Sequence, residues 1–485
     1  METIYNTIVE KIVSRSISFF IDKCSTMTEP SMEDKSEHNL QRLLLRARVI
    51  VEEAEGRDIT NQAMVHQLNI LRKEMYRGYY TLDNFRSQEG EPTKVNDQGV
   101  SHSFALSKFN SAKRLFLSSR NTHDKEELEQ VSESLHSIIC DMNEFKVFLE
   151  NYSPLYRQPY SMHLFLDNCM FARQMEMDFV MNFLVRAEFS SAESVGILPI
   201  VGPPAVGKST LVSHVCSNER VRNLFSRIVL VTEDDLKDPC LNTSNDNRVI
   251  KYQNDASNGN EAILVIIELP KDIDEDTWKG IYSIFVGRIA RGSKILITSR
   301  SSKITKFGTT QALVLNYLTR EAFWYFFKVV TFGSADPEEQ PKLASMAMEI
   351  GMGINGSFIG ANLIGGLLRS NLNIEFWSKV LNFARMYVQM NMYKFGEHPN
   401  SLLQKNKSTY FRRMASADYC VVRNQYQTSF DHGEVPTITF EDVLFGSVEC
   451  RGRVQVLAWR SQIPPHKNHI FSCDIRKPRR RRMAR

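Results

Sequence analysis

The stretch Gly202-Pro203-Pro204-Ala205-Val206-Gly207-Lys208-Ser209-Thr210 matches the pattern G-x-x-x-x-G-K-[ST] at every fixed position. Glycine at the two fixed positions allows backbone angles and close approaches that a Cβ would block, so successive N–H groups can point at phosphate oxygens. Lys208 supplies a cation for the outer phosphates, the Ser209 hydroxyl is suited to ligate Mg²⁺, and Thr210 is expected to reach toward the inner phosphate. The stretch therefore predicts a nucleotide site.

The flanking residues have the order that such a loop requires. Val195-Gly196-Ile197-Leu198 is typical of a strand, and Leu211 to Val215 is typical of a helix whose N-terminus adds a positive dipole end. Pro199 fits a central strand badly, because it cannot donate to the hydrogen-bond ladder. The alternative is a chance match, which we expect in roughly 2% of chains of this length.

Short apolar strands and helices alternate around this loop. We expect strands at 195–201, 228–231, 263–267 and 294–298, with helical stretches between several of them, such as Trp278 to Ala290. This alternation predicts a parallel, doubly wound sheet, the α/β fold of P-loop NTPases, with its ligand at the carboxyl ends of the strands.

The third of these strands is expected to supply an acid that supports the metal. Its apolar run ends in Glu268, which together with Ser209 gives two oxygen ligands for Mg²⁺, but the next residue is Leu269. A second acid at this point often polarises the attacking water. The nearby carboxylates of Asp272, Asp274, Glu275 and Asp276 are better interpreted as a solvated turn and helix start. We expect nucleotide binding without catalytic residues, and at most a weak ATPase.

Length and composition indicate a multidomain protein of a reducing compartment, which we expect to be cytoplasmic. The chain has 485 residues, 42% of them hydrophobic, and eight scattered cysteines without a C-x-x-C pair. No apolar run has the length of a membrane span, and the first residues lack a signal-peptide layout.

The formal net charge of +4 is concentrated at the C-terminus. Without the seven arginine and lysine residues of 476–485, the net charge of the rest of the chain is −3. Nucleic acid is therefore not an expected partner of the folded body. The basic run is either a solvated tail, the simpler interpretation, or a nuclear-localisation patch.

Residues 1–150 predict a bundle of four amphipathic helices. The first stripe runs from Tyr5 to Val13, and Gln88 to Asn121 is expected to connect the third and fourth helices. The other three stripes consist of Leu40, Leu43, Leu44, Ala47, Val51 and Ala54; of Met64, Leu68, Leu71, Met75 and Leu82; and of Leu128, Val131, Leu135, Ile138, Met142, Phe145 and Leu149. Such a bundle has little room for a catalytic site, so contact with other proteins is its expected role.

An ordered set of motifs resembles the NB-ARC nucleotide-binding domain of plant disease-resistance proteins, closest to a divergent cereal branch. The set runs through Phe171 to Glu176, the phosphate loop, Ile263 to Glu268, Gly292 to Arg300 and Leu315 to Trp324. The preceding bundle resembles the Rx-type coiled-coil domain of the same proteins. The resemblance covers roughly residues 1 to 390, and the order of the motifs is more specific than any one of them.

This resemblance implies roles for particular residues. Arg173 and its neighbours would lie near the adenine and ribose, the phosphate loop would hold ADP or ATP with Mg²⁺, and Arg300 would sense the terminal phosphate. In such proteins bound ADP keeps a resting state, and exchange for ATP permits oligomerisation and defence signalling. The bundle would contact other proteins, through self-association or through another resistance protein.

The sequence also departs from the family pattern. Ala172 stands at the usual glycine, 352–358 lacks the proline that helps cover the adenine, and Tyr79 to Asp83 replaces the acidic EDVID segment. We find neither a Met-His-Asp triplet nor leucine-rich repeats.

The last part of the chain has no family assignment. Thr437 to Phe440 and Val454 to Trp459 have strand-like composition, which predicts a small β-containing module. His466, His469 and Cys473 suggest a metal site only weakly, and surface histidines are the better interpretation.

Two functions from different classes remain: a nucleotide-dependent defence switch with little or no turnover, and an interaction adaptor or decoy with a decayed nucleotide site. An ordinary NTPase or kinase is the weakest alternative, because no catalytic base is evident. The expected domains are a helical bundle (1–150), a linker (151–165), the nucleotide-binding domain (166–312), a helical ARC-like subdomain (313–395), an unassigned module (396–475) and a basic tail (476–485).

Overall fold

The computed structural model forms two compact units, Met1–Phe85 with Lys94–Ser153 and Arg86–Thr93 with Pro154–Arg485. It describes residues 32–55, 57, 59, 61–89, 110–152, 170–186, 195–232, 249–250, 262–269, 272–286, 292–414, 416, 418–425, 435–446, 452–463 and 468–477. The predicted first stripe, Tyr5 to Val13, most of the 151–165 linker and the basic tail beyond Lys477 lie outside these residues.

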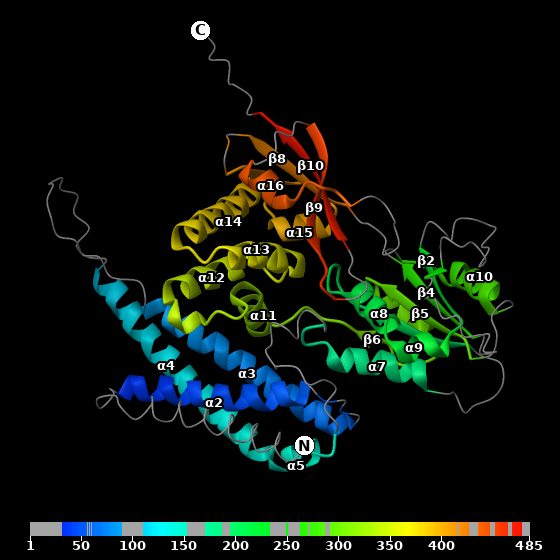
Figure 1. The fold of residues 1–485 in the computed structure, drawn as a ribbon, viewed down its shortest axis with the longest axis horizontal. Coiled ribbons are helices and arrows are strands. Elements are labelled where there is room, and N and C mark those ends of the chain that lie inside the picture. The colour runs from blue at the N-terminus through cyan, green and yellow to red at the C-terminus, as the bar shows by residue number, and fades with distance from the viewer. Residues whose placement is uncertain are drawn as a thin grey trace, which may run out of the picture. The chain divides into compact units, whose positions relative to one another are not determined.

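The first unit contains four described helices, drawn in blue to cyan in Figure 1: α2 (Met32–Glu55), α3 (Gln62–Glu89), α4 (Asn110–Asp141) and α5 (Asn143–Leu149). The apolar stripes predicted for the second and third helices are buried. A Cβ built on Gly78 of α3 would lie 2.7 Å from Cδ2 of Leu44 and 3.5 Å from Cγ1 of Val131. The three long helices therefore meet at this glycine.

Two predictions for the fourth helix are wrong in detail. Ile139 is fully buried and Ile138 only half-buried, because the stripe steps by four residues after Leu135 and by three before Met142. The helix also begins at Asn110, inside the stretch from Gln88 to Asn121 that was expected to be a connection. Composition alone did not reveal this part of the helix, because polar residues occur in solvated helices as well as in connections.

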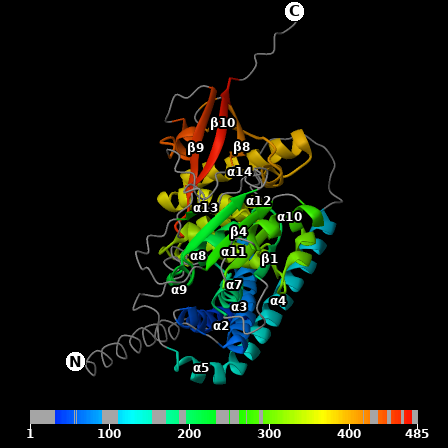
Figure 2. The ribbon, with the colours of Figure 1, turned by 90° about the vertical axis from the view of Figure 1, so that its right-hand side faces the viewer.

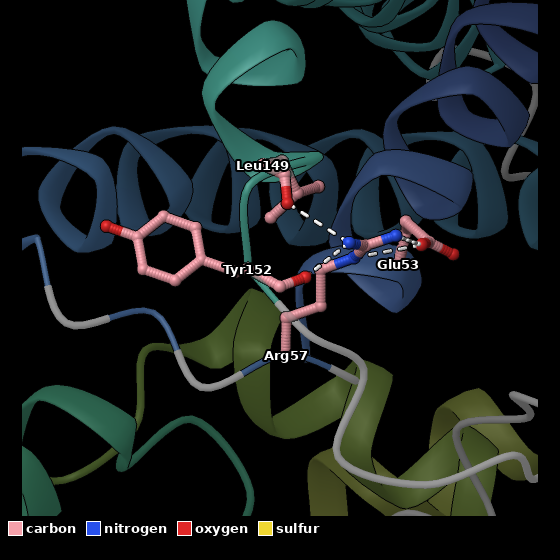
Figure 3. Close-up of polar contacts among 4 residues, drawn as sticks. All are labelled: Glu53, Arg57, Leu149 and Tyr152. Atoms are coloured by element: carbon pink, nitrogen blue, oxygen red, sulfur yellow. Dashed lines mark hydrogen bonds and ion pairs between the residues drawn. The ribbon is translucent and has the colours of Figure 1, made fainter.

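Arg57 ties the end of α5 to the residues that follow α2 (Figure 3). Its Nη1 donates to the carbonyl oxygens of Leu149, at 3.1 Å, and Tyr152, at 2.5 Å, while its Nε donates to Glu53 at 3.0 Å. The last carbonyls of a helix have no partner within the helix, so this guanidinium satisfies groups that would otherwise face water.

The second unit is built on a sheet with the order β3-β2-β4-β5-β1-β6. Strands β2, β4, β5, β1 and β6 pair in parallel, and β3 is antiparallel to β2. Their bounds are β1 Gly196–Val201, β2 Arg227–Thr232, β3 Val249–Ile250, β4 Ile263–Leu269, β5 Lys294–Ser299 and β6 Leu313–Val314. The four predicted strands and their parallel arrangement are thereby confirmed.

Helices cover both faces of this sheet, with α8 and α9 on one side and α10 on the other (Figure 2). The first face buries Leu198, Leu264 and Leu296, and the second buries Ile197, Val265 and Ile295. The covering elements are α7 (Gln174–Val185), α8 (Lys208–Cys216) and α9 (Glu219–Leu224) on the first face, and α10 (Glu275–Val286) and the 3-10 turn η3 (Ser302–Phe307) on the second.

Pro199 is accommodated because β6 pairs with β1 only at Ile200 and Val201. Before that point the neighbours of β1 on this side are Thr309 and Thr310, whose side chains bond to Ile197. Proline thus stands where the β1–β6 ladder has not yet begun.

Helices follow the sheet and lead to a second, antiparallel sheet, drawn in orange and red in Figure 1. The helices are α11 (Arg320–Phe332), α12 (Pro341–Ile354), α13 (Phe358–Ser370), α14 (Ile374–Phe395) and α15 (Pro399–Gln404), with the 3-10 turn η4 (Pro337–Glu339) after α11. The second sheet has the order β7-β8-β10-β9, formed by β7 Thr409–Arg412, β8 Tyr419–Gln425, β9 Gly452–Arg460 and β10 Asn468–Arg476.

The C-terminal module is β-containing, as predicted, but one of its two expected strands is reduced to an isolated bridge between Thr439 and Leu457 of β9. Val454 to Trp459 lies in β9, whereas Phe440 begins the helix α16 (Phe440–Phe445). Thr439 caps this helix: its hydroxyl accepts from the N–H of Asp442, whose carboxylate accepts from Thr439 in return. A capping box thus outweighs the β-propensity of Thr-Ile-Thr.

Among the residues that the structure describes, no helix combines the length and the apolar character needed to span a membrane.

Candidate nucleotide-binding site

The phosphate loop connects the carboxyl end of β1 to α8. Gly202 N–H donates to the carbonyl oxygen of Ser299 at 3.2 Å, which ties the start of the loop to β5. A Cβ at Gly202 would lie 2.4 Å from the carbonyl oxygen of Leu315, closer than packed atoms can come. Glycine is therefore required here by the backbone after β6, as well as by any ligand.

The loop backbone has the conformation of an anion cradle. Ala205 and Gly207 both have left-handed φ values, of 58° and 97°. When such residues alternate with residues of negative φ, successive N–H groups can turn toward one side. The nine-residue helix α8 begins directly afterwards, at Lys208, with its positive dipole end toward the loop.

Lys208 is half-buried and held by the loop itself. Its Nζ donates to the carbonyl oxygens of Gly202, at 2.7 Å, and Pro203, at 2.8 Å. Burial lowers the pKa of Lys208 to about 8; the positive charge of Arg300 lowers it further, and Glu268 opposes both effects. The ammonium is thus close enough to Arg300 and Glu268 to feel both charges.

Three neighbouring strand ends bring these charged residues together. In the sheet order β4-β5-β1, Glu268 of β4 pairs in register with Thr298 of β5, and Arg300 follows β5 directly. Arg300 is exposed and Glu268 is half-buried. Two cations and one carboxylate therefore lie at the same edge of the sheet as the loop.

The residues expected to hold Mg²⁺ are of a suitable kind. Ser209 and Thr210 stand in the first turn of α8 and are half-buried, and Glu268 lies across β5 from this helix start. A hydroxyl and a carboxylate are the hard oxygen ligands that Mg²⁺ takes together with phosphate oxygens and water. The donor set fits the ion when a nucleotide supplies the remaining ligands.

Leu269, which follows Glu268, is buried in the core, with 2% of its surface exposed. The side chain that follows Glu268 is therefore apolar and has no group that could polarise a water.

Arg173 is held by other groups of the protein. Its guanidinium is buried and donates to Glu176 at 2.9 Å and to the carbonyl oxygen of Asn316 at 2.5 Å. The preceding Ala172 has a left-handed φ of 52°, which explains why glycine suits this position in the resembled family. The approach of this segment to adenine and ribose stays a prediction.

Tyr317 is a contact of the loop that sequence reasoning did not single out. Its hydroxyl donates to the carbonyl oxygen of Pro204 at 2.9 Å, and Oε1 of Gln404 in α15 is 3.4 Å away. The residue lies in the quoted motif Leu315 to Trp324, but a contact 113 positions away cannot be inferred from spacing.

An apolar cavity of about 150 Å³ borders the loop at Ala205. Gly353, Ile354, Ser357 and Phe358, from the segment that lacks the family's proline, form part of its wall. The rest comes from α12, α13, α14, α15, α16 and the antiparallel sheet. The cavity offers apolar surface beside the phosphate loop.

His398 joins two parts of this wall. Its Nε2 lies 3.0 Å from the carbonyl oxygen of Gly353, and its Nδ1 accepts from the N–H of Asn400 at 3.2 Å. Because Nδ1 accepts, Nε2 carries the proton and donates to Gly353. Burial lowers the pKa of His398, so the neutral ring is favoured.

The weak metal suggestion near the C-terminus gains no support. His469 stacks on Trp459, with ring centroids 5.2 Å apart, and Cys473 is fully buried. His466 lies outside the described residues. Within the part of the chain that is described, no three His, Cys, Asp or Glu side chains gather as a metal site would require.

Among solved structures, an Aeropyrum pernix ORC2 protein is similar over 47% of this chain and 71% of that chain, at 12% identity and a TM-score of 0.27. Drosophila ORC bound to DNA is similar over 48% and 65%, at 12% identity and a TM-score of 0.23. TM-scores this low support no conclusion about function.

No family model matches the chain. Disease resistance protein RGA2 of Solanum bulbocastanum is 26% identical over 228 residues, which are 44% of this chain and 23% of that protein. RPP13-like protein 1 of Arabidopsis thaliana, also named for disease resistance, is 23% identical over 367 residues, 72% of this chain and 34% of that protein. The chain thus spans a quarter to a third of the length of these relatives. Its curated relatives are plant disease resistance proteins of the kind that the order of its motifs predicts.

Proposed function

We propose that this protein is an ADP- or ATP-binding switch of plant defence that binds nucleotide with little or no turnover. The observation that carries the proposal is the phosphate loop, in which left-handed Ala205 and Gly207 precede the N-terminus of α8 beside Lys208 and Arg300. An anion-binding backbone and two cations at one sheet edge suit a nucleoside di- or triphosphate.

Each residue of the site has a proposed role. The loop from Gly202 to Gly207 and the first turn of α8 bind the phosphates through N–H groups, and Lys208 exchanges its carbonyl acceptors for phosphate oxygens. Ser209 and Glu268 hold Mg²⁺, which would supply charge neutralisation on the phosphates, and Arg300 detects the terminal phosphate. Arg173 positions the segment from 170 to 173 beside the site, while the wall at Ala205 and Ile354 supplies apolar surface for the base.

Slow turnover follows from the apolar residue at 269. General-base catalysis contributes typically about 10²- to 10⁴-fold, and the buried side chain of Leu269 has no group that could accept a proton. We therefore propose no enzymatic role beyond weak ATP hydrolysis.

The switch would act on the helices after the sheet. Tyr317 connects Pro204 of the loop to the neighbourhood of α15, and His398 connects the start of α15 to Gly353 at the end of α12. Repositioning of the loop by nucleotide thus has a path of hydrogen bonds into residues 313–395, proposed as the ARC-like subdomain next to the nucleotide-binding domain 166–312. Partner proteins would bind to the bundle of residues 1–150, in the cytoplasm.

Two observations favour the alternative, an adaptor or decoy with a decayed site. Arg173 donates to protein oxygens, and 352–358 has no proline to cover a base. In this alternative the bundle or the C-terminal module makes the functional contacts.

The nucleotide content of the purified protein distinguishes the two. Nucleotide released by denaturation and quantified by chromatography is expected to be near-stoichiometric ADP, and to disappear in Lys208→Ala. A well-folded wild-type protein that holds no nucleotide and binds neither ADP nor ATP on addition would favour the adaptor. Phosphate release near or above ~1 s⁻¹, ordinary for an enzyme, would contradict weak turnover.

A further inference from the structure

The outer face of the C-terminal antiparallel sheet carries a group of arginines around a tyrosine. Side chains alternate between the two faces of a strand. The inner positions Phe411, Cys420, Val422 and Cys473 are buried, and they pack toward the helices and α16. The outer positions are therefore those between them, and several of these are exposed.

The strand register sets the outer residues side by side. Tyr419 of β8 pairs with Arg412 of β7 on one side and with Arg476 of β10 on the other. Two residues further along the strands, on the same face, the paired residues are Tyr410, Val421, Asp474 and Arg453. Two residues beyond these, again on the same face, they are Arg423, Ser472 and Gln455.

The charge of this face is strongly positive. Arg412, Arg423, Arg453 and Arg476 are all exposed, and Lys394 of α14 has its Nζ 3.3 Å from the ring centroid of Tyr410. Asp474 is the only carboxylate in the described strands β7, β8, β9 and β10, and it accepts from Arg476 at 2.5 and 2.8 Å. We name these residues, with Tyr419, the basic sheet face.

Two kinds of group on the basic sheet face select its partner. The arginines suit phosphates spaced along a chain, and the ring of Tyr419, 38% exposed between two of them, offers a surface for stacking. A phospholipid headgroup or a glutamate side chain would satisfy the charges but has no aromatic face that could stack on the ring. Unstacked bases with a phosphate backbone use both.

We propose that the basic sheet face binds single-stranded nucleic acid, with Tyr419 stacking on a base and Arg412, Arg453 and Arg476 contacting phosphates. The proposal departs from the expectation drawn from net charge, because a charge of −3 outside the tail conceals how unevenly the charges are distributed. The sequence continues after β10 with four further arginines, Arg479 to Arg482, and the test below separates their contribution from that of the sheet.

The first test is the binding of a labelled 20-nucleotide oligo(U) to the full chain, measured by fluorescence anisotropy at 50, 100 and 200 mM salt. The double variant Arg412→Glu/Arg453→Glu is expected to bind at least ~10-fold more weakly. Its log–log salt slope is expected to be smaller by about 1.4, since each phosphate contact to a single strand contributes about 0.7.

The matched control is Lys342→Glu/Lys379→Glu, the same charge change at exposed positions of α12 and α14. Its affinity is expected to stay within about twofold of wild type. Equal losses in both variants would mean that only overall charge matters, and would overturn the proposal.

Variants of Tyr419 test the stacking role, because they leave the charge of the basic sheet face unchanged. Tyr419→Ala is expected to weaken binding by roughly 5- to 150-fold, the range for one stacked base, whereas Tyr419→Phe keeps the ring and the affinity. Unchanged binding in Tyr419→Ala would contradict the stacking role, and the proposal with it.

Three further measurements distinguish nucleic-acid binding by the sheet from general anion binding and from binding by the tail. Phosphatidylserine vesicles and a poly-glutamate peptide are expected to bind more weakly than oligo(U) and to be indifferent to Tyr419→Ala. A chain ending at Lys477 is expected to keep measurable binding that Arg412→Glu/Arg453→Glu still lowers. Complete loss on this truncation, or stronger binding to the vesicles or the peptide, would overturn the proposal.

Discussion

Lys208 Nζ donates to the carbonyl oxygen of Gly202, six positions earlier, and so folds the phosphate loop back onto its own start. The bond keeps an ammonium at the phosphate position, although burial penalises its charge. Nucleotide phosphates would replace these carbonyls as acceptors and remove the penalty, so the loop is arranged to receive an anion.

Lys208→Met is therefore expected to abolish stabilisation by ADP while changing the Tm of the free protein little. Two hydrogen bonds are lost, but so is a partly buried charge. At an ADP concentration of 100 Kd the wild type is expected to gain about 2.7 kcal/mol, and the variant nothing. Thermal melts with and without ADP measure both numbers. A variant stabilised as much as the wild type would exclude Lys208 from the site.

The affinity for ADP is expected to fall as the pH rises through about 8, the pKa of Lys208. If only the charged ammonium binds phosphate, affinity drops about tenfold between pH 7 and pH 9. Isothermal titration calorimetry at these two pH values measures the drop. Because arginine stays charged at both, the affinity of Lys208→Arg is expected to be the same at pH 7 and pH 9.

The free protein has the opposite dependence on pH. In the unfolded chain the ammonium of Lys208 has its ordinary pKa of 10.5, and in the folded chain its pKa is about 8. Between these pH values the unfolded chain therefore binds more protons than the folded chain. The contribution of Lys208 to stability therefore rises between these pH values. Stability that falls in this window in the wild type relative to Lys208→Arg would contradict the lowered pKa.

Gly202→Ala is expected to disrupt the loop, because the new Cβ would lie 2.4 Å from the carbonyl oxygen of Leu315. Overpacking against backbone costs about 1–3 kcal/mol, and the shifted loop should bind ADP poorly. Gly366→Ala is the control: nothing lies within 4 Å of its Cβ position in α13, so the change should stabilise the helix by about 1 kcal/mol. Chemical denaturation compares the two.

Tyr317→Phe removes the hydrogen bond to Pro204 and leaves the ring in place. A net loss of about 0.5–1.5 kcal/mol would weaken ADP binding by about 2- to 12-fold if the bond holds the loop in its binding conformation. Tyr393→Phe, at a side chain with 95% exposure, should change nothing. Equal ADP affinities in all three proteins would show that the bond is irrelevant to binding.

Arg57→Ala is expected to destabilise the first unit by about 1–2 kcal/mol, since the carbonyls of Leu149 and Tyr152 lose a charged donor. Arg42→Ala, at an exposed position of α2, should stay within about 0.5 kcal/mol of wild type. Thermal denaturation of the full chain, followed by circular dichroism, distinguishes the two.

The loop and the sheet could be predicted because their signals are local. A fixed pattern marks the loop, and uninterrupted apolar runs mark strands buried on both faces. Local signals also caused the errors: a three-residue step selected Ile138 instead of Ile139, and β-branched residues at 437–439 hid the helix cap at Thr439.

Other features depend on residues far apart in the chain. The contact of Tyr317 with Pro204 spans 113 positions, and the basic sheet face gathers arginines from 412 to 476 only through the strand register. The net charge, which can be counted directly from the sequence, does not show that positive charges gather on one face of this sheet.

The close approach of Leu315 to Gly202 limits where the chain can bend. Leu315 N–H also donates to the carbonyl oxygen of Val201 at 2.8 Å, so the backbone is fixed to the loop up to this residue, and α11 begins at Arg320. A hinge between sheet and helices therefore has only residues 316–319 to turn on. Two of these residues are held by hydrogen bonds: the carbonyl oxygen of Asn316 accepts from Arg173, and the hydroxyl of Tyr317 donates to Pro204. A change in the angle between the sheet and the helices would therefore have to break both bonds.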